Sequence, residues 1–286
     1  MNVDKIRNED TFKFFDWKWN RVPQWGEDTK HIYHEWYLNK YNFSKEEFLK
    51  FLSKKKKILD VGCGVGRDIK FFRENSIEAE IVGIDQSEHA INFLKKENLE
   101  NVSLYRLDIT RDLGSLGKFD FISCDQVLHH TPNPEQTILD LTNILESGGH
   151  MHLFVCKKKN TLRDLIDDKI MHHSRHMSPE ELWNFSVKVT EFGKALHSLG
   201  IQNIEYLGKN YETLQSLIHN QTFRCWYNPE IDFDLSVSSN YDWFSNNPRY
   251  SKDEFLSFFI PIKNISIENV YEDDACVAVR IIKNSN

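Results

Sequence analysis

The sequence is poor in the features that mark secreted, zinc-bound or membrane-spanning proteins. Its five cysteines are scattered, odd in number and never spaced as a CxxC pair. They predict reduced thiols rather than a disulfide framework or a zinc site, as expected in the cytoplasm. The polar first residues, MNVDKIRNED, lack the apolar region of a signal peptide. No apolar run approaches the ~20 residues that a membrane helix needs, so we expect a cytoplasmic protein without a membrane partner.

Positive charge is also in short supply. Lysine and arginine number 36 against 43 aspartates and glutamates, which gives a formal net charge of −7. Such a balance disfavours general binding to phosphate backbones. The lysine run at 54–57 is the one candidate for a basic patch, but it directly precedes a predicted strand, where solvated charges are ordinary. We therefore expect no nucleic-acid partner.

Strand and helix signals alternate along the first half of the chain. Its 286 residues, 40% of them apolar, suffice for one large α/β domain with an insertion. Short apolar runs predict strands at 58–61, 80–84, 102–105, 119–124 and 150–156. Helical spacing predicts helices at 65–74, 87–97 and 134–145, the last closed by a Gly148-Gly149 turn. This series requires right-handed crossovers and a doubly wound, mostly parallel sheet.

The alternation stops after residue 156. Helical patterns follow at 161–170, 179–199 and 211–219, and a helix at 252–259 precedes two strands at 264–270 and 275–282. The sequence thus predicts seven core strands and four parts. In chain order these are an aromatic-rich helical lid at 1–50, the core at 51–156, a helical cap insertion at 157–250, and a closing helix with two strands at 251–286.

Three glycines stand on alternate positions where the first strand ends, in KKKKILDVGCGVGRDIKFF at 54–72. Glycine permits a tight turn and close approach of a ligand, and parallel sheets bind ligands at the carboxyl ends of their strands. Asp85 ends the second strand, 19 residues beyond Gly66. A carboxylate there accepts hydrogen bonds from both hydroxyls of a ribose. A plain turn would explain the glycines but not Asp85, so we expect a ligand that contains a nucleoside.

The charged residues near the loop indicate which nucleoside-containing ligand is bound. The dinucleotide fingerprint needs a third glycine at position 67, where this chain has Arg67. Asp60, within the first strand, would repel a pyrophosphate and attract a cation. S-adenosylmethionine carries an ammonium group and a sulfonium, so electrostatics favours it over a nicotinamide dinucleotide.

These residues resemble the first motif of class I S-adenosylmethionine-dependent methyltransferases, of the type 11-like kind. The similarity begins at KILDVGCGVG (57–66) and continues through IVGID (81–85), LDIT (107–110), FDFISCDQVLHHTPNP (119–134) and LESGGHMHLFV (145–155). It covers about 100 residues in family order, far more than a lone glycine motif. The resemblance implies a Rossmann-like sheet whose last strand is antiparallel, and S-adenosylmethionine as cofactor.

The resemblance also implies which residues contact the cofactor. They are Asp60, Gly62, Cys63, Gly64, Asp85, Gln86, Asp108, Ile109, Asp125 and Gln126. Asp60 would orient the methionyl amino group, and Asp85 would hold the ribose beside the adenine neighbour Gln86. Asp108 and Ile109 would meet the adenine, unless Asp108 instead caps the segment that follows it. Asp125 and Gln126 would lie near the sulfonium and the acceptor, whereas Cys63 is equally readable as an inert packing residue.

Other absences point to the acceptor. No (N/D)PPY-like run follows the fourth strand and no paired-glutamate loop is evident, which leaves a small molecule methylated on oxygen or nitrogen. Sugars, sugar nucleotides, quinone precursors and secondary metabolites stay open, and the Asn-, His-, Lys- and Asp-rich insertion favours a polar one. A hydroxyl acceptor needs a base. His129 and His130, just beyond the fourth strand, are the candidates for this catalytic role, and a structural role is the alternative.

Two further groups are candidates for contact with the acceptor. His172, His173 and His176 form an HHxxH pattern that fits a helix, but no further ligand is obvious, so we predict a solvated or acceptor-facing cluster rather than a metal site. Trp19, Tyr241 and Trp243 are the aromatic candidates, with packing as the alternative. An aminopropyl-type transfer or a non-catalytic scaffold are the rival functions, ahead of a nicotinamide dehydrogenase. The oligomeric state stays open.

Overall fold

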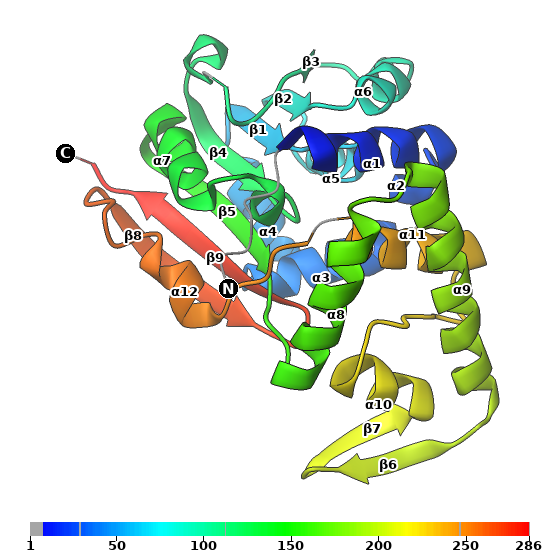
Figure 1. The fold of residues 1–286 in the computed structure, drawn as a ribbon. Helices are drawn as coiled ribbons and strands as arrows, with labels where there is room; N and C mark the ends of the chain where they lie inside the picture. Colours follow the sequence, from blue (N-terminus) through cyan, green and yellow to red (C-terminus); the bar gives the residue numbers. More distant parts are fainter. Residues whose placement is uncertain (1–7, 29, 112, 246, 286) are drawn as a thin grey trace. The chain divides into compact units, whose positions relative to one another are not determined.

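A seven-stranded sheet organises the larger part of the chain (Figure 1). The computed structural model describes residues 8–28, 30–111, 113–245 and 247–285. The strands are β1 (Lys57–Val61), β2 (Glu80–Asp85), β3 (Val102–Arg106), β4 (Phe119–Cys124), β5 (Leu145–Cys156), β8 (Ile265–Glu272) and β9 (Cys276–Lys283). Their order is β3-β2-β1-β4-β5-β9-β8, and the first five are parallel. β9 is antiparallel to both neighbours, which confirms the predicted Rossmann-like fold with an antiparallel last strand.

Helices cover both faces of this sheet. One face packs against α3 (Lys30–Lys40), α4 (Lys45–Leu52), α5 (Arg67–Asn75) and α6 (Glu88–Lys95), and the other against α7 (Pro134–Ile144) and α12 (Lys252–Ser257). The neighbours Ile58 and Leu59 of β1 belong to opposite hydrophobic clusters, as the two-residue period of a strand requires. Each is fully buried, which contributes about 1.5–3 kcal/mol per side chain.

The chain divides into two compact units. The first contains residues 19–157 and 248–286, and the second contains residues 9–18 and 158–247. Besides part of α1 (Asn8–Arg21), the second unit holds α8 (Thr161–Ser174), α9 (Pro179–Ser198), α10 (Leu214–Gln221), α11 (Phe233–Phe244) and a hairpin of β6 (Gln202–Tyr206) and β7 (Lys209–Thr213). A short α2 (Trp25–Asp28) belongs to the first unit. Ser178 forms a capping box ahead of Pro179 at the start of α9, and Asn160, Thr213 and Asp232 cap α8, α10 and α11.

Two predicted features of the secondary structure are wrong, and two elements were missed. The helix predicted at 211–219 begins only at Leu214, because residues 211–213 belong to β7. The hairpin and α11 were not predicted. The Gly148-Gly149 pair lies inside β5 rather than in a turn after the helix, which ends at Ile144. Gly148 has φ +76, so the pair accommodates an irregular strand start.

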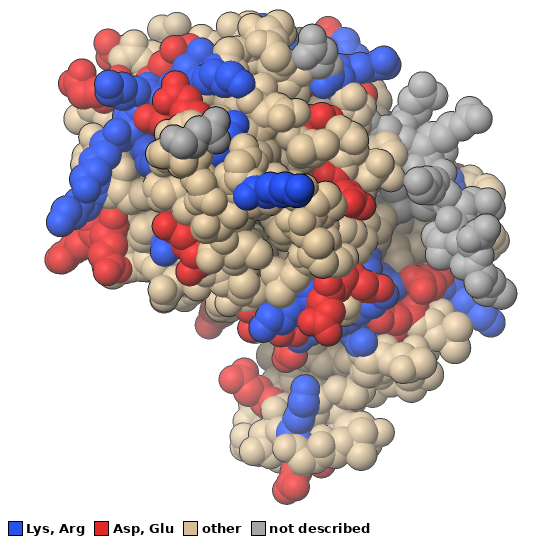
Figure 2. Space-filling view, turned by 90° about the vertical axis from the view of Figure 1, so that its left-hand side faces the viewer, with Lys and Arg blue, Asp and Glu red and all other residues tan. Residues whose placement is uncertain are grey.

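The described surface carries mixed charge. On the face that Figure 2 shows, lysine and arginine are interspersed with aspartate and glutamate rather than gathered into one large patch. Among the described helices, none has the length and apolar character to cross a bilayer.

Candidate functional site

The glycine loop after β1 folds onto the end of β2. The backbone N–H groups of Gly62 and Cys63 donate to the Ile84 carbonyl at 2.7 and 3.0 Å. Gly62 and Gly64 have φ of +67 and +50, in the left-handed region that favours glycine. A Cβ at Gly62 would lie 2.4 Å from Val127 Cγ2. The loop therefore tolerates no side chain here, as the resemblance requires.

Asp60 offers a buried acceptor beside this loop. Its side chain is 3% exposed, and Oδ2 has no hydrogen-bond partner among the residues that the structure describes. Burial, and then the neighbouring Asp68, raise the pKa of Asp60 well above its ordinary value. A buried acceptor that lacks a donor is costly. A cationic N–H donor from a ligand would satisfy this oxygen.

Asp85 holds the loop from the end of β2. Its Oδ2 accepts from the Gly64 backbone N–H at 2.9 Å, and its Oδ1 accepts from the Ser87 N–H at 2.7 Å. The carboxylate is thus fixed between the glycine loop and the start of α6, and the half-buried Gln86 follows it. Its contact with a ribose stays a prediction.

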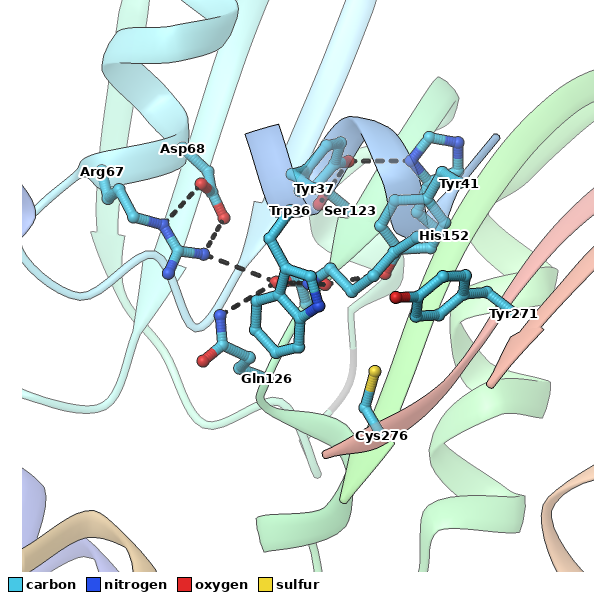
Figure 3. A network of polar contacts seen from close by, with 12 residues as sticks. Trp36, Tyr37, Tyr41, Arg67, Asp68, Ser123, Gln126, His152, Tyr271 and Cys276 are labelled. Atoms are coloured by element: carbon cyan, nitrogen blue, oxygen red, sulfur yellow. Dashed lines mark hydrogen bonds and ion pairs between the residues drawn. The ribbon is translucent and has the colours of Figure 1, made fainter. Parts of the chain in front are cut away.

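Asp125 is the centre of a buried polar network, shown in Figure 3. It accepts from Lys40 Nζ at 2.6 and 2.8 Å and from the Tyr41 hydroxyl at 2.8 Å. Arg67 at 3.5 Å and Gln126 Nε2 at 3.1 Å complete its partners. Burial alone would raise the pKa of Asp125, but the charges of Lys40 and Arg67 and these hydrogen bonds outweigh it, so the pKa lies below its ordinary value. The carboxylate stays ionised.

Gln126 has φ +61, a conformation that non-glycine residues rarely adopt. Such strain clusters at functional sites, where the surrounding structure enforces it. The Gln126 side chain also donates to Asp125 Oδ2, so this turn directly after β4 is tied to the buried carboxylate.

Four aromatic side chains form a row whose first member lies against the glycine loop: Trp19, Trp25, Tyr33 and Trp36. We call this row the aromatic segment. Successive ring centroids are 5.9, 5.0 and 5.9 Å apart. A Cβ at Gly64 would lie 3.0 Å from Trp19 Cζ2, so the indole rests on the bare backbone.

Cations fasten the aromatic segment to the core. The Arg67 guanidinium lies 4.7 Å from the Tyr33 ring centroid, and Lys40 Nζ lies 4.0 Å from that of Trp36. Trp36 Nε1 donates to Asp273 at 3.0 Å. Trp19, predicted as an acceptor contact, thus touches the predicted cofactor loop.

The two histidines after β4 have different surroundings. His129 is 2% exposed, and its Nε2 lies 3.5 Å from the Cys156 sulfur. Burial, and then the adjacent His130, hold the pKa of His129 well below its ordinary value. His130 is half-buried, and its ring centroid lies 4.1 Å from that of His129. Of the pair, His130 is thus the one closer to solvent.

The remaining cofactor candidates lie within the same unit. Cys63 is 7% exposed, and its sulfur packs against Gly83. Ile109 is also 7% exposed and belongs to the hydrophobic core. Asp108 accepts from the backbone N–H and hydroxyl of Thr110 at 2.8 and 2.7 Å, which is the local capping that the sequence left open as its alternative role. Their contacts with adenine stay predictions.

The acceptor candidates in the second unit fall into a buried and an exposed group. Tyr241 is fully buried and donates to the Phe14 carbonyl at 2.9 Å, and Trp243 donates to Asp167 at 2.8 Å. The three histidines His172, His173 and His176 are exposed at the end of α8. Within the described residues, no group of three His, Cys, Asp or Glu side chains is arranged to hold a metal ion.

Sequence reasoning missed Lys40 and Tyr41, the principal partners of Asp125. They lie 85 and 84 residues away along the chain. No local sequence motif predicts such a pair. The available signal was that Lys40 and Tyr41 stand at the end of an aromatic-rich helical stretch. A lysine buried by such a stretch requires an anionic partner.

The fold and these contacts define a Rossmann-like protein with a glycine loop after β1, an anchored carboxylate at the end of β2 and a buried carboxylate oxygen that lacks a donor among the described residues. The residues therefore fit S-adenosylmethionine, and the partnerless Oδ2 of Asp60 is the observation that shows the fit.

Comparisons with known proteins agree with this class. The profile of a family described as "Methyltransferase domain" matches residues 52–217, more than half of the chain. The chain therefore belongs to this family, that of the class I S-adenosylmethionine-dependent methyltransferases.

Individual relatives are more distant. An uncharacterized methyltransferase of Schizosaccharomyces pombe is 26% identical over 59% of this chain, and the match spans 63% of that relative's length. A ubiquinone biosynthesis O-methyltransferase of Acinetobacter baumannii is 25% identical over 64% of this chain and 76% of its own length. The solved plantazolicin methyltransferase in complex with SAH has a TM-score of 0.50 at 13% identity, covering 97% of this chain and 96% of that one, which shows a shared fold.

Proposed function

We propose that this protein methylates a hydroxyl oxygen of a small, polar metabolite. The cofactor half of this proposal depends on Asp60, whose buried Oδ2 lacks a donor among the described residues. The oxygen specificity is supported by the A. baumannii relative named as an O-methyltransferase and by the histidine pair after β4. Nitrogen acceptors remain the alternative that the experiment below distinguishes.

The residues of the loop would hold the cofactor. Asp60 would accept from the methionyl ammonium, Gly62 and Gly64 would leave room for the ligand, and Asp85 would accept from the ribose hydroxyls. When bound, S-adenosylmethionine supplies a methyl group on a sulfonium sulfur that a nucleophile displaces in line. Asp125 is already paired with Lys40, so its role is to position Gln126 and the aromatic segment rather than to exchange protons.

His130 is the proposed general base. A neutral hydroxyl becomes a sufficient nucleophile only when its proton is removed as the bond forms. His129 is poorly suited, because an imidazole with a strongly lowered pKa is a weak proton acceptor at neutral pH. We assign it the role of supporting His130 by ring contact. His130→Asn should therefore lower the methylation rate, whereas donor binding should stay unchanged.

We further propose that residues 1–50 act as a lid and that the insertion at 157–250 contributes to the acceptor cavity. In the second unit, the polar atoms of Tyr241 and Trp243 already donate hydrogen bonds to Phe14 and Asp167. These two side chains would therefore contribute to the shape of the acceptor cavity rather than hydrogen bonds to the acceptor. The exposed histidines His172, His173 and His176 offer hydrogen bonds to a polar acceptor. A His172→Ala/His176→Ala variant with unchanged acceptor affinity would remove them from the site.

The decisive experiment measures binding and turnover separately. Calorimetry with S-adenosylmethionine and S-adenosylhomocysteine should show binding that Asp85→Ala strongly weakens. Release of S-adenosylhomocysteine should then be followed across matched panels of hydroxyl and amine acceptors. Turnover with hydroxyl compounds that is lost in His130→Asn supports the proposal. Turnover with amines alone overturns the oxygen specificity, and binding without any turnover favours a scaffold.

A further inference from the structure

Two cysteines face each other across the antiparallel strands β5 and β9. Cys156 is the last residue of β5 and Cys276 the first of β9, and the register places them directly opposite one another. Side chains of directly opposite residues project from the same face of a sheet. Both residues are thiols in the structure.

The backbone hydrogen bonds show which kind of pair this is. The next pair along the ladder, Lys157 and Ala275, is hydrogen-bonded, with Lys157 N–H donating to the Ala275 carbonyl at 3.0 Å. Hydrogen-bonded and non-hydrogen-bonded pairs alternate in antiparallel sheets. Cys156 and Cys276 therefore form a non-hydrogen-bonded pair.

Other contacts of the two cysteines agree. The Cys276 N–H donates to Asp273 Oδ1 at 2.8 Å, and its carbonyl accepts from the Asp273 N–H at 3.2 Å, so both groups point away from β5. The Cys156 carbonyl accepts from the Tyr250 N–H at 2.9 Å, away from β9.

This geometry suits a disulfide. In a non-hydrogen-bonded pair the Cα atoms are about 4.5 Å apart, and disulfides join Cα atoms roughly 4.4–6.8 Å apart. The other three cysteines of the chain have no such neighbour, because within the described sheet Cys124 faces Leu153, Cys63 lies in the glycine loop and Cys225 lies in the second unit.

The surroundings assign different roles to the two sulfurs. Cys156 is half-buried, and its sulfur lies 3.5 Å from His129 Nε2. Cys276 is fully buried, and burial raises the pKa of its thiol. Cys156 is therefore the sulfur that a reagent reaches first, and Cys276 is the resolving thiol behind it.

We propose that Cys156 and Cys276 form a site of reversible oxidation, in which a low-molecular-weight disulfide converts the two thiols into a cross-strand disulfide. The Cys156 thiolate attacks one sulfur of the reagent and releases one thiol. The Cys276 thiolate then attacks the Cys156 sulfur and releases the second. The protein loses two protons and two electrons, which the reagent disulfide takes up as it is reduced to two thiols.

Oxidation would alter two contacts of the candidate site. It would take the Cys156 thiol away from His129, the residue packed against the proposed base. It would also join β5 to the turn where Asp273 holds both the Cys276 N–H and the Trp36 indole. A disulfide at this position would therefore change contacts of both the histidine pair and the aromatic segment.

The test counts thiols in the native protein. After incubation with oxidised glutathione, thiols are blocked under denaturing conditions and counted by mass. The count should fall from the five of the sequence to three, and peptide mapping should show Cys156 linked to Cys276. Dithiothreitol should restore five. The matched control Cys225→Ser should fall from four to two, whereas Cys156→Ser should stay at four with no linked peptide.

Three outcomes would overturn the proposal. They are an unchanged count of five, a linkage between other cysteines, or a glutathione adduct on Cys156 that never resolves into the internal disulfide. Because Cys276 is fully buried, Cys276→Ala serves as a second variant that adds no polar atom to the core, and it too should stay at four thiols with no linked peptide. None of these readouts depends on methyl transfer, so they leave the proposed function untouched.

Discussion

Lys40 has the largest expected effect on stability of any single residue in the site. Its ammonium and the Asp125 carboxylate are each 1% exposed. Removing one partner of a buried pair leaves an uncompensated charge, which costs about 3–5 kcal/mol. Lys40→Met should therefore lower the free energy of unfolding by about that amount, as measured by urea denaturation.

Two variants serve as controls for this prediction. Lys30 lies on the same helix as Lys40, and Lys30→Met removes only an exposed ion pair with Glu27, so it should change stability little. Lys40→Met/Asp125→Asn removes both charges and should recover most of the loss. A double variant as unstable as Lys40→Met alone would show that packing, rather than charge, explains the effect.

Asp60 should show a conflict between stability and binding. Its pKa is raised in the folded state by burial and by Asp68, so the ionised form destabilises the fold. The acid form contributes its full stability below the ordinary pKa of 3.8, and this contribution is lost as pH rises through the raised value. Asp60→Asn should therefore gain stability relative to the native protein as pH rises, in denaturation curves measured across pH.

The same variant should bind S-adenosylmethionine about tenfold more weakly or worse, since a hydrogen bond to a charged group contributes roughly 1.5–3 kcal/mol. Calorimetry supplies the measurement. Parallel pH curves for the two proteins, or undiminished affinity, would contradict the role assigned to the buried oxygen.

At the scale of elements, the β6–β7 hairpin carries an unfavourable turn. Leu207 and Gly208 have φ of +50 and +73, the pattern of a type I′ turn, which favours Asn-Gly. Leu207 is 82% exposed, so its side chain gains little from packing. Leu207→Asn should raise the free energy of unfolding by about 0.5–1 kcal/mol through relief of backbone strain.

Leu199 is the matched control for this change. It is 62% exposed but has φ −66, where asparagine has no conformational advantage. Leu199→Asn should therefore leave stability unchanged or slightly lower. Equal stabilisation by both variants would mean that removal of exposed apolar surface, rather than the turn, is responsible.

The elements that the sequence failed to predict share a physical cause. The central parallel strands β1 and β2 are buried over most of their length, so their apolar signal is strong. β6 reads QNIEY, with Ile204 as its one apolar aliphatic residue, and leucine is an unusual residue for the first position of a type I′ turn. α11 reads FDLSVSSNYDWF, in which serine and asparagine weaken helix propensity although tertiary contacts bury most of the helix.

For the whole molecule, donor binding should stabilise the first unit selectively. At a hundredfold excess over its Kd, a ligand adds about 2.7 kcal/mol to the free energy of unfolding of the state it binds. Hydrogen exchange with S-adenosylmethionine should slow over residues 57–75 and 80–86, where the loop and Asp85 lie. Peptides from 158–247 should change little without an acceptor. Protection confined to the second unit would place the donor site elsewhere.

The site was predictable where chemistry follows local order. Asp60, the glycine loop and Asp85 stand at fixed offsets around strand ends, so their convergence follows from a parallel sheet. The pairing of Lys40 with Asp125 spans 85 residues and depends on how α3 packs, which no spacing rule encodes. The same holds for Cys156 and Cys276, which become neighbours only through the register of the last strand.

The aromatic segment contacts the core at several points: Trp19 at Gly64, Tyr33 at Arg67, and Trp36 at Asp273. In the proposed role of residues 1–50 as a lid, a spent donor would leave past these rings. Exchange of one donor molecule for the next would then require the segment to open and close in every catalytic cycle. Opening of the segment, rather than the displacement reaction, would be the rate-limiting step of turnover.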